Sequence, residues 1–208
     1  MKELIAYKLK KDQVLTYEQG INMLLKSRDG ETAAGRSTSK SRLKVLDVAG
    51  DGNMTIEMTQ EPLTFEGILM GSLPEEFTRA RFSFAMKPDG TLTDVSGESA
   101  FPHTASFPSQ PVGEGEGWVA ERGTSVTEYV VLSFEKKKDE LIAHLVSTAH
   151  DKNELEGLDT TVESTIDFSL TRGCHLQSTS VIEMAYADGR TLSIVMENAL
   201  AGSATTTR

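Results

Sequence analysis

The side chains that could perform acid, base or nucleophilic chemistry are scattered along this sequence. The histidines, His103, His144, His150 and His175, lie in separate segments, and no two have the spacing of a two-histidine metal motif. The single cysteine, Cys174, precedes His175. Neighbouring residues on a strand point to opposite faces, so these two side chains cannot form a thiolate–imidazole pair there. We therefore expect no metal site and no catalytic cysteine.

Two short segments resemble ligand loops only superficially. Residues 47–58 contain aspartates and glycines, but Ala49 and Met58 occupy positions where a calcium loop needs oxygen ligands. Residues 113–117 alternate glycine with glutamate, whose charge repels phosphate, and no Lys-Ser or Lys-Thr pair follows them. The Gly-x-Ser-x-Gly sequence of many hydrolases is absent. The sequence therefore predicts no enzymatic activity and no cofactor.

The charge of the chain limits its partners. The formal net charge is -10 over 208 residues, with a pI of about 4.9. Coulomb repulsion opposes the approach of such a chain to nucleic acid or to an anionic lipid surface. The run Lys136-Lys137-Lys138 lies between two apolar segments and is typical of a solvated turn. We therefore exclude nucleic acid as a partner.

The cellular compartment stays open. A single cysteine cannot form an intramolecular disulfide. No run approaches the ~18 apolar residues that a membrane span needs, so we expect no transmembrane segment. The first residues contain no long apolar stretch typical of a signal peptide. A cytoplasmic protein fits, and so does a periplasmic or surface-anchored one whose signal was removed, and the localisation is therefore unknown.

Apolar and polar residues alternate along most of the chain, which is the period of a strand with one buried face. Turn sequences separate these runs at residues 50–53, 88–90 and 188–189. The hydrophobic content of 38% suits a sheet with one solvated face. The clearest alternating rows are Met54, Ile56 and Met58; Phe82, Phe84 and Met86; and Val162, Ile166, Phe168 and Leu170. We predict an all-β fold of ten to twelve strands, forming a strongly curved antiparallel sheet or an incomplete β-barrel.

The remaining segments suggest how the chain is organised. Residues 27–40 are polar and contain glycine, which favours a mobile loop. Residues 101–117 hold three prolines and are interpreted as a connector. Few short helices are expected, the best candidate being residues 152–156. We predict a single β domain, 1–208, with two similar halves at about 1–100 and 111–200 as a hypothesis.

Four features occur in a fixed order along most of the chain. They are the strand containing Tyr17, the hairpin Asp47-Val48-Ala49-Gly50-Asp51-Gly52, the segment from Phe84 to Gly97, and Pro108-Ser109-Gln110-Pro111-Val112 followed by Gly115 and Trp118. Together they resemble a group of bacterial exported or lipid-anchored domains of unknown function. Such domains are similar in architecture to the lipoprotein-localisation factors, whose half-barrel holds acyl chains on its concave face. The resemblance implies a concave, lipid-accepting face here.

The functional hypothesis rests on the apolar face of the predicted sheet. That face is rich in methionine, a flexible side chain that adapts to varied apolar ligands. We expect non-enzymatic binding of a lipid-like apolar or amphipathic ligand on the concave face. The alternative is a protein-interaction or assembly module that uses its sheet face or edge, and a concave face filled by its own side chains would favour it. The candidate ligand-binding residues are Met54, Met58, Phe82, Phe84, Met86, Ile166 and Phe168.

Overall fold

The computed structural model describes residues 1–30, 32–61, 64–67, 80–96, 105–122, 125–153 and 158–205. Within these ranges every regular element is a β-strand. The strands are β1 (Lys2–Glu3), β2 (Gln13–Lys26), β3 (Thr32–Val48), β4 (Met54–Gln60), β5 (Thr64–Gly67), β6 (Ala80–Met86), β7 (Leu92–Ser96), β8 (Val112–Gly113), β9 (Gly117–Arg122), β10 (Ser125–Lys137), β11 (Glu140–Asn153), β12 (Leu158–Ser169), β13 (Cys174–Tyr186) and β14 (Thr191–Thr205).

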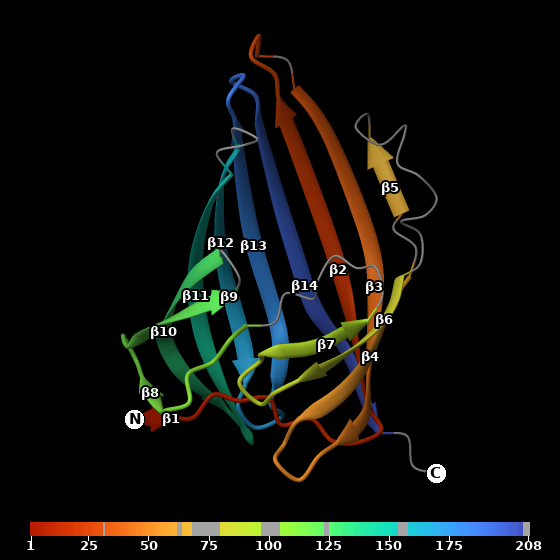
Figure 1. Cartoon of the computed structure of the whole chain (residues 1–208), viewed down its shortest axis with the longest axis vertical. Helices are drawn as coiled ribbons and strands as arrows, with labels where there is room; N and C mark the ends of the chain where they lie inside the picture. Colours follow the sequence, from red (N-terminus) through yellow and green to blue (C-terminus); the bar gives the residue numbers. More distant parts are fainter. Residues whose placement is uncertain are drawn as a thin grey trace.

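One large antiparallel sheet dominates the molecule (Figure 1). Its strand order is β7-β6-β4-β3-β2-β14-β13-β12-β11-β10-β9, with β5 paired to β3 beside β4, while β1 and β8 form a separate two-stranded sheet. The order ends at β7 and β9, which do not pair with each other, so the sheet is not closed into a barrel. The predicted all-β, curved antiparallel architecture is confirmed.

The predicted turns lie where the sequence placed them. Gly52, Gly90 and Gly189 have positive φ values of 86°, 85° and 87°, a conformation that side chains with a Cβ rarely adopt. Each follows an aspartate whose side chain accepts a backbone hydrogen bond two residues further on, as Asp89 does from Thr91 N at 2.8 Å. Short turns of this kind join neighbouring antiparallel strands and fix their register.

The expectation of a loop at residues 27–40 is wrong for most of that range. Only the turn at residues 27–30 fits, because β3 begins at Thr32 and pairs with β2 from Lys26↔Thr32 onward. The inward residues of this part of β3, among them Gly35, Ser37 and Ser39, are small yet buried. Hydropathy alternation cannot detect a strand whose buried side chains are serine and glycine.

The other two irregular segments are partly described. In the helix candidate at 152–156, residues 152–153 belong to strand β11, because pairing with β12 overrides their local preference for a helix. Residues 154–156 lie outside the described residues. Of the predicted connector at 101–117, residues 105–111 run between β7 and β8 and bury Phe107. The division into two similar halves stays a prediction.

The hydrophobic core lies at one end of the long strands, on the face of the sheet that we call the inner face. Strands β6 and β7 cross over this lower part, whereas the long strands extend beyond it (Figure 1). Residues 4–10, here called the N-terminal strap, cover the core with alternating buried residues, Ile5, Tyr7 and Leu9. The Lys8 backbone donates to Gly173 O at 3.2 Å, and a Cβ at Gly173 would collide with that backbone. The core is therefore closed at the lower end.

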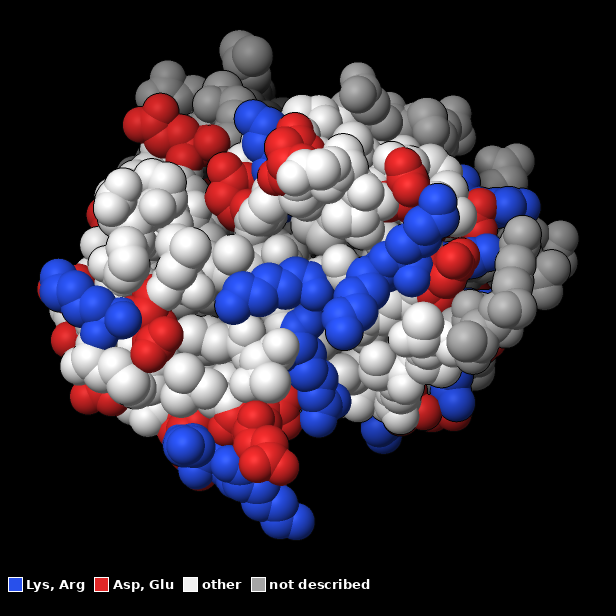
Figure 2. Space-filling view, turned by 90° about the horizontal axis from the view of Figure 1, so that it is seen from below, with Lys and Arg blue, Asp and Glu red and all other residues white. Residues whose placement is uncertain are grey.

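The same lower end carries a concentration of positive charge. Seen from below, Lys and Arg side chains run across the middle of this end, although the chain as a whole is acidic (Figure 2). The strap contributes the exposed Lys8 and Lys10, and the turn between β12 and β13 contributes the exposed Arg172. The lower end of the core is therefore both covered by the strap and positively charged.

Candidate functional site

A row of apolar side chains continues along the inner face above the closed core. These residues are partly buried, and none belongs to the core cluster. We call them the apolar wall: Ile21, Met23 and Leu25 of β2, Val162 of β12, Ile182 and Met184 of β13, and Leu192, Ile194 and Met196 of β14. Contiguous apolar side chains that remain partly exposed are a feature of many interaction and ligand sites.

The strand register assembles the wall from distant parts of the sequence. Val162 lies opposite Ile182, Ile182 opposite Ile194, and Ile194 opposite Met23. A second row joins Met184, Leu192 and Leu25 in the same way. Side chains opposite one another on the same face of a sheet have Cβ atoms ~5 Å apart, so each row presents a continuous apolar surface.

A cavity of about 240 Å³ lies between the wall and the core. From the wall it is lined by Val162 and Met196, and from the core by Tyr129 and Ile166, with His175 as a further lining residue. Serines occupy the space between them: Ser147 lies opposite Ser164, and Ser164 lies opposite Ser180. The hydroxyls of Ser164 and Ser180 are 2.8 Å apart. The site thus joins an apolar surface to a row of neutral hydroxyl groups.

The floor of this cavity is electrically neutral at physiological pH. Burial lowers the pKa of His175 from 6.5 to about 4, because desolvation disfavours the imidazolium. The ring lies 3.0 Å (Nε2) from the hydroxyl of Tyr7 in the strap, and the backbone carbonyl of His175 accepts from the Tyr17 hydroxyl at 3.3 Å. Burial also raises the pKa of Tyr17. These groups are therefore positioned as neutral hydrogen-bonding partners.

Most of the candidate residues taken from the sequence lie in the closed core rather than around a cavity. All are on the inner face, and Phe84 and Phe168 are 1% and 0% exposed. The strap and the 105–111 segment cover Phe168, whose ring centroid is 4.7 Å from that of Phe107. Met58 is only partly buried against the core. The residues that share the core are Met54, Phe82, Phe84, Met86, Ile166 and Phe168, and Ile166 also lines the cavity.

The sequence already contained a signal for the wall. Met23, Met184 and Met196 lie on apolar strand faces that the alternation predicts, but most residues of the rows with the clearest alternation belong to the core. In β2, Leu24 interrupts the alternation and obscures the inward set Ile21, Met23 and Leu25. The strap and the β4–β7 strands cover some apolar rows and not others. Their position is set by tertiary folding, which the hydropathy pattern does not show.

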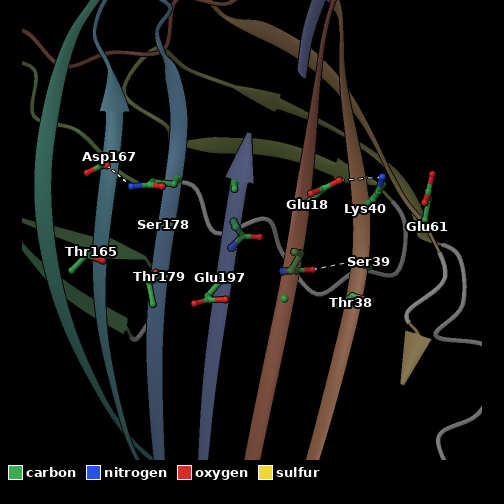
Figure 3. A pocket seen from close by; sticks show the side chains of 15 residues that line it. Glu18, Thr38, Ser39, Lys40, Glu61, Thr165, Asp167, Ser178, Thr179 and Glu197 are labelled. Carbon is green, nitrogen blue, oxygen red and sulfur yellow. Dashed lines mark hydrogen bonds and ion pairs between the residues drawn. The ribbon is translucent and has the colours of Figure 1, made fainter. Parts of the chain in front are cut away.

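A larger depression of about 630 Å³ lies on the opposite, outer face of the sheet (Figure 3). It spans β3, β2, β14, β13 and β12, and Gly20 and Ala199 contribute little side-chain bulk there. Its rim is polar: Glu18 pairs with Lys40 at 3.1 Å, and Asp167 accepts from Gln177 at 2.7 Å. Charged residues line this depression, whereas the inner cavity has no charged lining residue among those described and adjoins the apolar wall. The inner cavity therefore suits an apolar ligand better despite its smaller size.

Two of the reactive side chains, those of His144 and Cys174, lie in arrangements that do not favour nucleophilic chemistry. His144 has Nδ1 at 2.7 Å from Asp167 and Nε2 at 3.3 Å from Glu135, so both nitrogens already face carboxylates. Neither nitrogen is left to accept a proton from a nucleophile. Cys174 is buried, and burial raises the pKa of its thiol to about 11, which disfavours the reactive thiolate. No group of three or more His, Cys, Asp or Glu in the described part of the chain could hold a metal ion.

The described residues contain no helix with the length and apolarity that a membrane-spanning helix requires. No family model matches the chain, and no curated protein matches it. The resemblance to bacterial exported or lipid-anchored domains therefore stays a prediction.

A solved structure shares the fold over most of this chain. One alignment, to a structure of lipid–protein interactions in lipovitellin, has a TM-score of 0.60 at 10% identity and covers 97% of this chain. The chain corresponds to only 26% of that lipovitellin chain. A second alignment, to DynF from the dynemicin biosynthesis pathway of Micromonospora chersina, covers 95% of this chain and 84% of the other at 8% identity, but its TM-score of 0.29 carries no argument. The chain is thus similar in fold to part of lipovitellin.

Proposed function

We propose that this protein is a non-enzymatic binder of a lipid-like, amphipathic ligand on the inner face of its sheet. The observation that carries the proposal is the apolar wall, a continuous apolar surface above a core that is already closed. The likeness in fold to part of lipovitellin, from a structure of lipid–protein interactions, supports the same class of ligand.

The dimensions of the site suggest how such a ligand lies. The cavity of about 240 Å³ is below the roughly 300–1,000 Å³ of typical small-molecule sites. It therefore has room for the polar end of an amphiphile and a few carbons, while the remaining chain lies along the apolar wall.

The expected affinity is moderate. Full burial contributes about 0.8 kcal/mol per methylene, and a chain lying on an open surface is buried on one side only. About ten methylenes then contribute roughly 4–8 kcal/mol, which corresponds to dissociation constants between about 1 mM and 1 μM. Such binding is measurable by fluorescence titration and is sensitive to single substitutions in the wall.

A matched pair of variants tests the proposal. Ile194→Asp places a carboxylate within the apolar wall, whereas Val195→Asp places one on the outer face of the same strand. We expect Ile194→Asp to weaken binding of a fluorescent alkyl probe at least about tenfold, because an apolar chain must desolvate the new charge. Val195→Asp should bind as the unmodified protein does.

The outcome also separates the two functional hypotheses. Equal weakening by both variants, in protein that circular dichroism shows to be folded, would place the ligand elsewhere. Absence of saturable binding up to about 1 mM would reject the lipid-binding proposal, because even a chain half buried on the wall should bind by that concentration. The protein-interaction hypothesis would then be the remaining one.

A further inference from the structure

The chemistry of the inner cavity restricts the polar end of the ligand. We propose that the site selects an uncharged, hydroxyl-bearing headgroup, as in a fatty alcohol or a monoacylglycerol, over a carboxylate, a phosphate or a quaternary ammonium group. This inference rests on the proposed function, because it assumes that the alkyl chain lies on the apolar wall.

The cavity offers no counter-charge. Asp, Glu, Lys and Arg do not occur among the described residues that line it. Five carboxylates are next in sequence to lining residues: those of Glu121, Glu128, Glu163, Asp167 and Glu197. They have the outward parity of their strands and lie on the other face of the sheet. A charged headgroup in this cavity would lose water without gaining an ion pair, and such desolvation costs several kcal/mol.

The cavity does offer hydrogen-bonding partners that suit a hydroxyl. Each serine hydroxyl has one donor and two acceptor positions, and an alcohol headgroup has the same set. Ser147, Ser164 and Ser180 lie side by side in register, and Ser178 adds a hydroxyl next to Ile166. Ser164 and Ser180 use one donor between them in their mutual contact at 2.8 Å. Their remaining lone pairs can accept a hydrogen bond from a ligand hydroxyl, and the remaining hydroxyl proton can donate one to it.

His175 strengthens the preference for a neutral group. Its imidazole lines the cavity and is the only ionisable ring among the described lining residues apart from the phenol of Tyr129. Burial holds the pKa of His175 near 4, so the ring carries no positive charge at neutral pH with which to balance an anionic headgroup.

Three ligands with the same alkyl chain test the inference: dodecanol, dodecanoate and dodecyltrimethylammonium, each titrated by displacement of the fluorescent alkyl probe. We expect dodecanol to bind at least about tenfold more tightly than either ion, since about 1.4 kcal/mol of unfavourable desolvation already changes affinity tenfold. Equal affinities for dodecanol and either ion would overturn the headgroup inference, while leaving the proposed function supported. Binding of none of the three would overturn both.

A pair of variants tests the placement of the headgroup. Ser180→Lys introduces a cation beside the proposed headgroup position, and Val181→Lys introduces the same charge on the outer face of the same strand. We expect Ser180→Lys to reverse the preference, so that dodecanoate binds more tightly than dodecanol, and Val181→Lys to leave it unchanged. If Ser180→Lys does not fold, Ser180→Ala should weaken dodecanol binding about two- to tenfold, the usual effect of one neutral hydrogen bond. An unchanged preference in folded Ser180→Lys, or unchanged dodecanol affinity in Ser180→Ala, would overturn the placement.

Discussion

Phe168 connects the sheet with the segments that cover it. Its ring centroid is 5.3 Å from that of Tyr7 in the strap, in an edge-on arrangement, and it also contacts Phe107 and His175. We predict that Phe168→Ala lowers the free energy of unfolding by about 3–5 kcal/mol, the usual cost of removing a fully buried aromatic ring. Urea denaturation measures this change. A loss below about 1 kcal/mol would show that the core is not packed as described.

His175 makes stability depend on pH. Its pKa is 6.5 in the unfolded chain and about 4 in the folded protein, so the unfolded chain binds the proton more readily between these values. The stability associated with the neutral imidazole is fully present above pH 6.5 and is lost as the pH falls through about 4.

The stability difference between the unmodified protein and His175→Gln isolates this effect from the titration of surface carboxylates. We predict that lowering the pH from 6.5 to about 4 destabilises the unmodified protein more than His175→Gln, approaching an extra ~1.4 kcal/mol per pH unit. Urea denaturation across this range measures both proteins. Parallel pH profiles would contradict a buried, neutral His175.

At the level of elements, β3 shows that a buried strand can be built from small polar residues. Ser37 is 1% exposed, and its hydroxyl has no hydrogen-bond partner among the described residues. The Ser39 hydroxyl, by contrast, is 3.3 Å from the Gln19 side-chain oxygen and 3.5 Å from the Gln60 amide nitrogen. A buried hydroxyl without a partner destabilises the folded state.

We predict that Ser37→Ala stabilises the protein by about 1 kcal/mol, because it removes an unsatisfied buried group while keeping the side-chain volume small. Ser39→Ala, on the same face of the same strand, should be neutral or destabilising because it removes hydrogen bonds. Thermal or urea denaturation distinguishes the two variants. Destabilisation by Ser37→Ala would indicate that this hydroxyl has a partner after all.

Strands with alternating hydropathy and turns with Asp-Gly sequences could be predicted from the sequence, whereas β3 could not. The rows Met54–Ile56–Met58 and Phe82–Phe84–Met86 alternate clearly, and the structure contains them as the paired strands β4 and β6. The turns with Asp-Gly sequences were predictable because positive φ requires glycine. The β3 strand was not predictable, because its inward residues carry no hydropathy signal and pairing with β2 determines its conformation.

On the scale of the whole molecule, the described segments bury the lower part of the inner face, while the apolar wall above it is only partly buried. The strap, β6, β7 and the 105–111 segment cover the lower part, and their buried residues belong to the core. The sequence indicated that the inner face is apolar, but not which part would be covered. For this reason the candidate residues chosen from the sequence lie mainly in the core, and whether any of them besides Ile166 borders a ligand stays a prediction.

The central claim is that a ligand lies on the apolar wall and not in the closed core. Methyl-labelled isoleucine and methionine side chains report on both places in one NMR experiment. On addition of dodecanol, we predict saturable shifts at the wall methyls of Ile182, Ile194 and Met196, with the core methyls of Met54 and Ile56 unchanged. Shifts confined to the core methyls, or no shifts at saturating dodecanol, would contradict the account.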